Sequence, residues 1–159
     1  MSYHMRRADR AITEQAEIES ILQHGRYITL ALASEEPYVV TLSYGYEPTE
    51  QRLYFHVASK GRKLDIISND PRACGTIIID QGYTQGECEH PFESVVMTGA
   101  LRLVTSDDEK LRAIRTLVEH LEDDAGVYWA SRSWQISDRL DGFTALAFEI
   151  DEITAKRGK

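Results

Sequence analysis

Cysteine is scarce in this sequence, and long apolar runs are missing from it. Cys74 and Cys88 are the only cysteines among 159 residues, too few for the disulfide framework of a small secreted domain. No stretch is apolar over the roughly 20 residues that a membrane-spanning helix needs. Residues 1–15 carry charge but no apolar segment of the kind that a secretory signal contains. We therefore expect a cytoplasmic protein.

Basic residues are also in deficit. The chain has 18 Lys and Arg against 26 Asp and Glu, which gives a formal net charge of −8. Such a charge repels nucleic acid and anionic membranes, so we expect neither as a partner. The motifs of P-loop, Rossmann, serine hydrolase and zinc protease sites are missing too. Neither a repeat nor a low-complexity linker interrupts the sequence, which predicts one domain over residues 1–159.

The sequence does contain a series of β-branched and aromatic segments. They predict six strands, over residues 26–34, 37–46, 52–58, 72–80, 92–105 and 143–154. Helical spacing of apolar residues predicts three helices, over residues 14–24 (with Thr13 as N-cap), 61–70 and 106–124. The pattern is mainly β and favours an antiparallel sheet curled into a small barrel, with a sandwich as the alternative.

Some positions within these segments carry a more specific prediction. Gly25 is expected to end the first helix. Glu35 and Glu36 are expected at the turn of a hairpin between the first two strands. Gly99 permits a bend or bulge in the long fifth strand. Cys74, within the fourth strand, is interpreted as a small buried hydrophobic residue.

Three basic residues, Lys60, Arg62 and Lys63, follow the third strand at the start of the second helix. The first turn of a helix presents free backbone N–H groups and the positive end of the helix dipole. Cations are unfavourable there unless an anion is bound, and the guanidinium of Arg62 can bind a phosphate through two hydrogen bonds. We therefore favour an anion site over the alternative, a solvated loop.

Other reactive side chains give weaker signals. His56 lies within a strand, where a single histidine is more often structural than catalytic. Residues 88–90, Cys-Glu-His, lack the repeated paired spacing of a zinc site, so no metal is expected. Trp129 and Trp134 lie outside the predicted strands, where they could cover a pocket or a partner subunit.

The segments "YFHVASKGRKLDII" (54–67) and "SVVMTG" (94–99) occur in an order that resembles one family. It is that of the pyridoxamine 5′-phosphate oxidase-like flavoproteins, and the nearest branch includes the nitroimidazole-resistance proteins. The similarity runs from about residue 26 to residue 122, with a weaker echo in "FEIDEITAKRGK" (148–159).

The resemblance implies a six-stranded antiparallel split β-barrel with peripheral helices, which forms a homodimer with FMN at the subunit interface. It implies that the basic residues at the second helix hold the flavin phosphate and that the second strand runs along the isoalloxazine ring. The third and fifth strands would add further contacts. The implied cofactor-binding residues are Val40, Thr41, Leu42, Ser43, Tyr44, His56, Val57, Lys60, Arg62, Lys63 and Ser94.

The resemblance also implies a flavin-dependent oxidoreductase that acts on a small aromatic or nitro compound. Pyridoxamine phosphate itself is not expected as the substrate, because the true oxidases have glutamine where Ser94 stands and arginine at the start of the second strand. The alternatives are a non-catalytic flavin carrier or sensor, and a split barrel that binds a deazaflavin or haem. No catalytic residue is predicted.

Overall fold

The computed structural model describes residues 6–132 and 136–158. Its strands are β1 (Ala11–Ile12), β2 (Tyr27–Leu32), β3 (Tyr38–Ser43), β4 (Gly45–Glu47), β5 (Arg52–His56), β6 (Arg72–Asp80), β7 (Phe92–Leu103) and β8 (Ala145–Gly158). Its helices are α1 (Gln15–His24), α2 (Arg62–Asn69), α3 (Asp107–Leu121) and α4 (Ala125–Ala130), with 3-10 turns η1 (Ala8–Arg10) and η2 (Ile136–Gly142). None of the described helices is long and apolar enough to cross a membrane.

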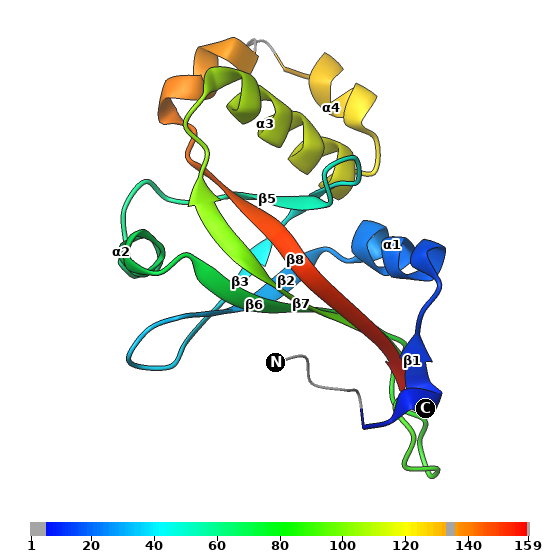
Figure 1. Cartoon of the computed structure of the whole chain (residues 1–159). Helices are drawn as coiled ribbons and strands as arrows, with labels where there is room; N and C mark the ends of the chain where they lie inside the picture. Colours follow the sequence, from blue (N-terminus) through cyan, green and yellow to red (C-terminus); the bar gives the residue numbers. More distant parts are fainter. Residues whose placement is uncertain (1–5, 133–135, 159) are drawn as a thin grey trace.

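The strands form one antiparallel sheet in the order β3-β2-β6-β7-β8-β5-β4, and β1 pairs with β8. β3 and β4 lie at opposite edges of this sheet, yet Tyr44 alone separates them along the chain. The sheet must therefore curl until its two edges approach each other, as the ribbon shows (Figure 1). The fold is thus a split barrel rather than a sandwich. The free edge of β3 borders the split.

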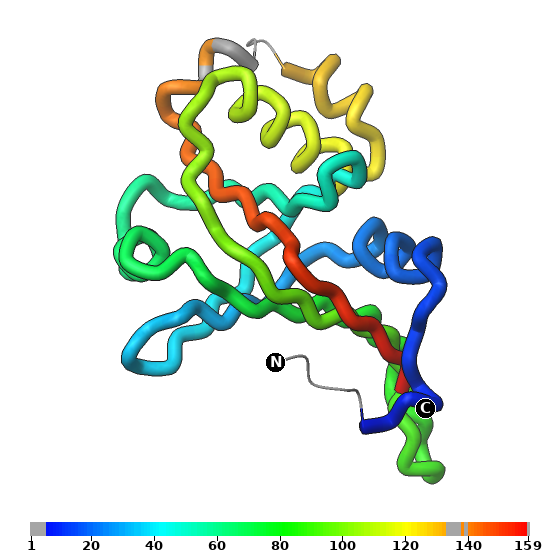
Figure 2. The backbone as a smooth tube through the Cα atoms, viewed as in Figure 1, coloured from blue at the N-terminus to red at the C-terminus, as the bar shows by residue number. Residues whose placement is uncertain are grey.

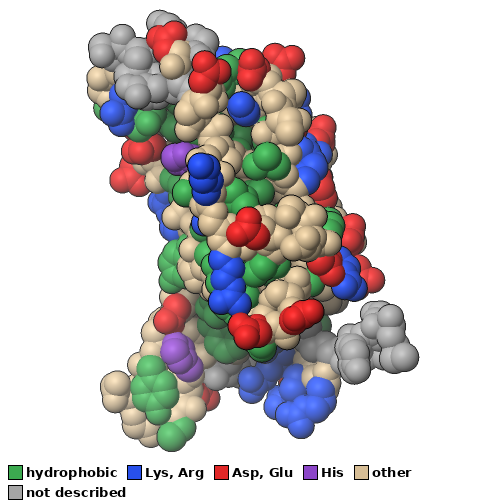
Figure 3. Space-filling model, turned by 90° about the vertical axis from the view of Figure 1, so that its left-hand side faces the viewer, with side chains coloured by type: hydrophobic (Ala, Val, Ile, Leu, Met, Phe, Trp, Pro, Cys, Tyr) green, Lys and Arg blue, Asp and Glu red, His purple; other side chains and the backbone are tan. Residues whose placement is uncertain are grey.

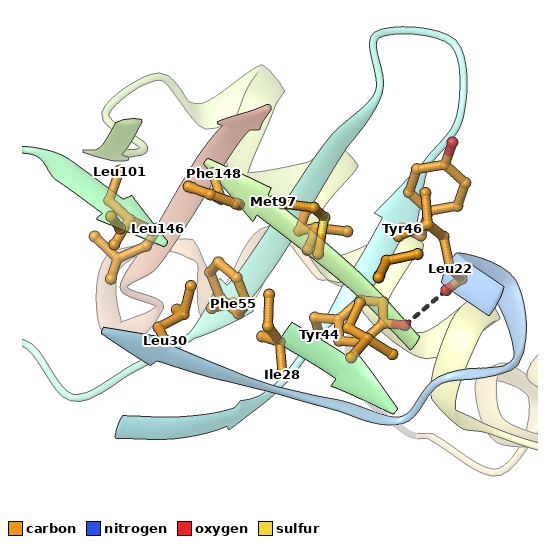
Figure 4. Packing of buried hydrophobic residues seen from close by; sticks show 14 of the residues in the cluster. Leu22, Ile28, Leu30, Tyr44, Tyr46, Phe55, Met97, Leu101, Leu146 and Phe148 are labelled. Carbon is orange, nitrogen blue, oxygen red and sulfur yellow. Dashed lines mark hydrogen bonds between the residues drawn. The ribbon is translucent and has the colours of Figure 1, made fainter. Parts of the chain in front are cut away.

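The predicted strand 37–46 is not continuous, because the chain changes partner at Tyr44. β3 pairs with β2, whereas β4 pairs with β5. The Tyr44 hydroxyl is buried and donates a hydrogen bond of 2.7 Å to the carbonyl oxygen of Leu22 (Figure 4). Gly45 passes so close to α3 that a Cβ there would lie 2.7 Å from the backbone nitrogen of Leu117. A predicted strand thus becomes two, and β1 brings the sheet to eight strands instead of six.

Several sequence predictions are confirmed. The β2–β3 hairpin forms around Glu35 and Glu36, and β6 has the predicted bounds. Gly25 ends α1. The register of β7 against β8 shifts between Thr98 and Gly99, where a Cβ on Gly99 would lie 1.9 Å from the carbonyl oxygen of Glu149. A side chain would not fit there, so the bulge requires glycine.

Three other predictions are wrong. Glu14 rather than Thr13 is the N-cap of α1, because β1 holds the chain extended against β8 up to Ile12. The helix predicted over residues 106–124 ends at Leu121, and Asp124 caps α4 instead, accepting a hydrogen bond from the Val127 amide. Cys74 is exposed, because alternation along β6 turns its neighbours toward the core and Cys74 outward.

The core fills the barrel with apolar side chains from almost every strand. Among the fully buried ones are Leu30, Phe55, Met97, Leu101 and Phe148, which converge between the sheet walls (Figure 4). A second buried cluster joins the outer side of β5 and β8 to α3. The backbone tube shows β8 running from beneath α3 to β1 at the far end of the barrel (Figure 2). α3, α4 and η2 therefore cover one end of the barrel, close to where the split opens.

Candidate functional site

The start of α2 carries the basic residues predicted to bind an anion. Arg62 is the first residue of the helix, and Gly61 before it has φ +134°, a conformation that favours glycine. No side chain caps this helix end. We call Lys60, Arg62 and Lys63 together the basic helix start. It presents backbone N–H groups and three cationic side chains, as an oxyanion requires.

Arg62 already has partners in the neighbouring hairpin. Its guanidinium carbon lies 4.7 Å from the centre of the Tyr38 ring, and its Nη2 lies 3.2 Å from the Glu36 carboxylate. Lys60 is exposed and Lys63 is half-buried, and neither forms an ion pair with a described residue. Figure 3 shows the side of the molecule that includes α2, where basic and acidic side chains surround patches of hydrophobic ones. The Tyr38 contact links the basic helix start to the first residue of β3.

The other end of β3 borders a cavity, here called the α3 groove. Its volume is about 520 Å³. One wall is β3 and the opposite wall is the apolar side of α3, with α4 and the segment before β8 closing the end. The lining residues are Thr41, Leu42, Ser43, His56, Ile114, Leu117, Val118, Leu121, Glu122, Tyr128 and Phe143. The groove therefore combines a strand edge with a mostly apolar wall, as sites for planar organic ligands do.

His56 is held in the groove by an aromatic neighbour. Its ring stacks on Phe143, with 4.9 Å between the ring centres and 22° between the planes. Neither nitrogen of the imidazole is hydrogen-bonded to another residue in the described part of the chain. The ring is exposed to the groove, so its nitrogens are available to a ligand.

The predicted cofactor residues thus divide into groups. Thr41, Leu42, Ser43 and His56 meet in the α3 groove, and the basic residues meet at α2. The side chains of the other four lie apart: Val40 is half-buried, while Tyr44, Val57 and Ser94 are buried. Burial and the nearby Tyr46 raise the pKa of Tyr44, whose hydroxyl is bonded within the core. Ser94 pairs with Ile78 and Lys156 in the sheet. Contacts of these four with a cofactor stay a prediction.

Sequence reasoning missed the helical wall of the groove. Leu117 and Val118 belong to the apolar stripe that predicted α3, but such a stripe reveals burial without showing which surface it faces. Glu122 and Phe143 fall within a predicted helix and a predicted strand but were assigned to no site, and Tyr128 lies outside the predicted elements. Trp129 packs edge-on against Tyr128 with 4.9 Å between ring centres. Trp134 lies outside the described residues.

A ring of charges anchors the first turn of α3 to the sheet. Glu109 accepts hydrogen bonds from Arg102 at 2.6 Å and from Arg52 at 3.1 Å, and Glu149 accepts from the same two arginines at 2.9 Å. The Tyr54 hydroxyl adds a bond of 3.1 Å to Glu109. The hydrogen bonds from Arg102 lower the pKa of Glu109 despite its partial burial. This end of the groove wall is therefore held electrostatically.

The other end of α3 is held by His120 and Arg26. The Nε2 of His120 lies 2.6 Å from the carbonyl oxygen of Gly25, and Arg26 donates to the carbonyl oxygens of His120 and Leu121. Burial lowers the pKa of His120, which favours the neutral ring. These contacts hold both ends of α3, the helix that forms one wall of the groove.

The sequence also matches one protein-family model. The family is described as pyridoxamine 5′-phosphate oxidase, and the match spans residues 14–157. The chain belongs to this family. The part matched to the pyridoxamine 5′-phosphate oxidase family contains the basic helix start and every lining residue of the α3 groove. No curated protein matches the sequence.

Several solved structures have the same fold, and the names of some of these proteins mention a cofactor. A candidate 5-nitroimidazole antibiotic resistance protein from Bacteroides thetaiotaomicron has a TM-score of 0.76 and 21% identity, over 93% of this chain and 86% of that one. The flavocytochrome Anf3 from Azotobacter vinelandii also has a TM-score of 0.76, at 19% identity over 97% and 72%. An FAD- and haem-binding protein from Mycobacterium smegmatis gives 0.76 and 17% over 94% and 74%. At such identities the likeness shows the split-barrel fold, which agrees with membership of the pyridoxamine 5′-phosphate oxidase family.

Proposed function

We propose that this protein binds FMN, with the phosphate at the basic helix start and the isoalloxazine ring in the α3 groove. The observation that carries the proposal is that β3 joins the two sites. Tyr38, at one end of β3, lies under Arg62, and Ser43, at the other end, lines the groove. At the rise of an extended strand these two residues are about 17 Å apart. An extended flavin mononucleotide has a comparable length.

The chemistry of the groove fits a flavin. β3 is an edge strand, so its outer N–H and C=O groups have no strand partner in the described part of the sheet. The pyrimidine side of a flavin presents alternating hydrogen-bond donors and acceptors, which an edge strand can satisfy. The dimethylbenzene side is apolar and suits Leu117, Val118 and Phe143. Haem is the second candidate, supported by the haem-binding proteins among the similar structures.

We further infer that the protein is a flavin-dependent oxidoreductase acting on a small aromatic or nitro compound. The bound flavin would supply the electron transfer, and the protein residues would orient the ring and exclude water from the groove. His56, stacked on Phe143, would position the ring or the acceptor. A flavin carrier or sensor would have the same residues but no turnover. Anaerobic reoxidation of the reduced protein by nitroaromatic and quinone acceptors distinguishes these functions.

The phosphate assignment is tested by replacing both Arg62 and Lys63 with alanine. Dissociation constants are measured for FMN and for riboflavin, which lacks the phosphate. Loss of charge-assisted hydrogen bonds costs about 1.5–3 kcal/mol each, so FMN affinity should fall at least tenfold while riboflavin affinity stays close to that of the unmodified protein. Arg115→Ala, an exposed charge on α3 that lies away from this site, is the control. Equal weakening of both ligands would overturn the assignment.

A further inference from the structure

The α3 groove has an uneven distribution of charge. Three of its described lining residues can ionise: His56, Tyr128 and Glu122. Glu122 is the one carboxylate among them. It follows the last turn of α3 directly, and Figure 1 shows this end of α3 on the side of the molecule away from α2. Its carboxylate forms no ion pair with any residue that the structure describes. The mostly apolar groove therefore ends at an exposed, unpaired negative charge.

The surroundings of Glu122 do not neutralise it. Asp123 and Asp124 follow it in the sequence, and the carbonyl groups of the α3 C-terminus add the negative end of the helix dipole. Two basic side chains are near this end. Arg26 is bonded to the helix carbonyls and pairs with Asp123 at 3.7 Å, while Arg132 lies 4.3 Å over the Tyr128 ring. Neither Arg26 nor Arg132 lines the groove, and each already contacts another group: Arg26 contacts carbonyl oxygens and Asp123, and Arg132 contacts the Tyr128 ring.

We propose that Glu122 determines substrate charge: the α3 groove accepts neutral or cationic aromatic molecules and rejects anionic ones. The proposal rests on the function proposed above and specifies its substrate class. An anion entering this end would lose part of its hydration against the apolar wall, would find no lysine or arginine among the described lining residues, and would face the exposed carboxylate of Glu122. A neutral nitro or carbonyl compound has none of these costs.

The same polarity would orient the flavin. Its phosphate is attracted to the basic helix start at one end of β3 and repelled by Glu122 at the other. The ring would then lie along β3, with its dimethylbenzene side against Leu117 and Val118 of α3, and the end of the groove at Glu122 would be left to the acceptor. Glu122 would be placed beside the acceptor rather than beside the phosphate. A residue in this position acts on selectivity and need not take part in electron transfer.

The test uses two acceptors that differ in charge but little in shape, 4-nitrobenzoate and 4-nitrobenzamide. Binding to the oxidised, flavin-loaded protein is measured by calorimetry, and reduction by anaerobic stopped-flow reoxidation. The unmodified protein should prefer the amide. Glu122→Gln should improve binding and kcat/KM of the benzoate about three- to tenfold, with less than a twofold change for the amide. Asp123→Asn, an exposed carboxylate next in sequence but outside the lining, should change neither.

The outcomes separate this inference from the proposed function. If Glu122→Gln leaves the benzoate-to-amide ratio unchanged, or if Asp123→Asn shifts it equally, Glu122 does not determine selectivity. If both compounds bind with the expected charge preference but neither reoxidises the flavin, the inference stands and the oxidoreductase activity fails. If the unmodified protein binds the benzoate as tightly as the amide, the inference is overturned, whatever the activity.

Discussion

At the scale of single residues, Arg62 has a competitor for the ligand it is proposed to bind. Glu36 holds one edge of its guanidinium at 3.2 Å, and a phosphate would have to displace that carboxylate. Both side chains are more than half exposed, so the pair contributes little by itself, about 0–1 kcal/mol. The Tyr38 ring meanwhile keeps the guanidinium close to β3. The position of Arg62 is therefore fixed beside β3, but a phosphate has to compete with Glu36 for its guanidinium.

Glu36→Gln should tighten FMN binding about two- to fivefold, because the competing ion pair is lost and a negative charge beside the phosphate is removed. Riboflavin binding should not change. Titration of each ligand by flavin fluorescence measures both constants. Glu35→Gln is the matched control, since Glu35 lies in the same turn and forms no ion pair with Arg62 in the structure. Weaker FMN binding in Glu36→Gln would show that the carboxylate assists the site instead.

At the scale of elements, the position of α3 determines the groove, and the charge ring around Glu109 fixes α3. Glu109→Gln removes the charge that binds both Arg52 and Arg102 while keeping the size of the side chain. We expect it to lower the free energy of unfolding at pH 7 by about 1–3 kcal/mol. Asp108→Asn, in the same helical turn but outside the ring, controls for the helix dipole. Denaturant unfolding monitored by circular dichroism measures both variants.

The same variant should alter the acid dependence of stability. Its neighbours lower the pKa of Glu109 in the folded protein, so the carboxylate stabilises the fold above the unfolded-state value of about 4.3. That contribution is lost as the pH falls through the folded-state pKa. The stability of Glu109→Gln should therefore approach that of the unmodified protein at low pH. A constant difference between pH 7 and pH 3 would contradict an electrostatic role.

Sequence patterns predicted most elements but not how they join. β6 and α2 follow from local periodicity and from Gly61 and Pro71, which bound them within a few residues. The division of β3 from β4 depends on the Tyr44 hydroxyl reaching Leu22 and on Gly45 fitting beneath α3. These are contacts between distant segments, and a local pattern does not contain them. β1 was missed because two residues are too few for a periodic signal.

The sequence likewise predicted one part of the candidate site and missed another. Chemical type and helix position indicated the basic helix start, and β3 was assigned to the ligand through family resemblance. The wall formed by Leu117, Val118 and Phe143 requires the tertiary arrangement of α3, so no sequence motif indicated it. Cys74 was placed in the core on composition, although its position in β6 alternates with inward-facing residues. At that position periodicity predicts better than residue type.

At the scale of the whole molecule, the outward face of the sheet is uncharged at the middle of β2, β6 and β7, while Glu152 and Lys156 of β8 lie beside this part. Pairing aligns Ala31, Cys74 and Thr98 in one row across β2, β6 and β7, and Thr29, Thr76 and Val96 in the next. Tyr27, Val39, Ile78 and Val96 are apolar side chains exposed on this face, by 61%, 58%, 55% and 42%. A second copy of the chain, the partner expected from the sequence, would cover such a face and border the split of the barrel where β3 lies exposed. The surface formed by these two rows and the four exposed side chains is called the outward sheet face.

The resulting prediction is a homodimer with two flavins, each contacted by both subunits. Sedimentation equilibrium should give twice the 18.1 kDa mass of the chain. Val96→Arg places a charge in the middle of the outward sheet face and should produce a monomer with weakened flavin binding, because burying an unpaired charge opposes association. Val127→Arg is the matched control, since Val127 is 64% exposed on α4, away from that face. It should remain dimeric.

The two cysteines offer an independent measurement of the same interface. Cys74 lies on the outward sheet face and Cys88 lies in the loop between β6 and β7, and both are exposed in the single chain. In a dimer, maleimide should label Cys88 quickly and Cys74 slowly, and Val96→Arg should make Cys74 as reactive as Cys88. Equal labelling of both thiols at concentrations where the mass is that of a dimer would place the interface elsewhere. A monomer that binds FMN tightly would contradict the shared flavin site, because the groove would then be complete within one chain.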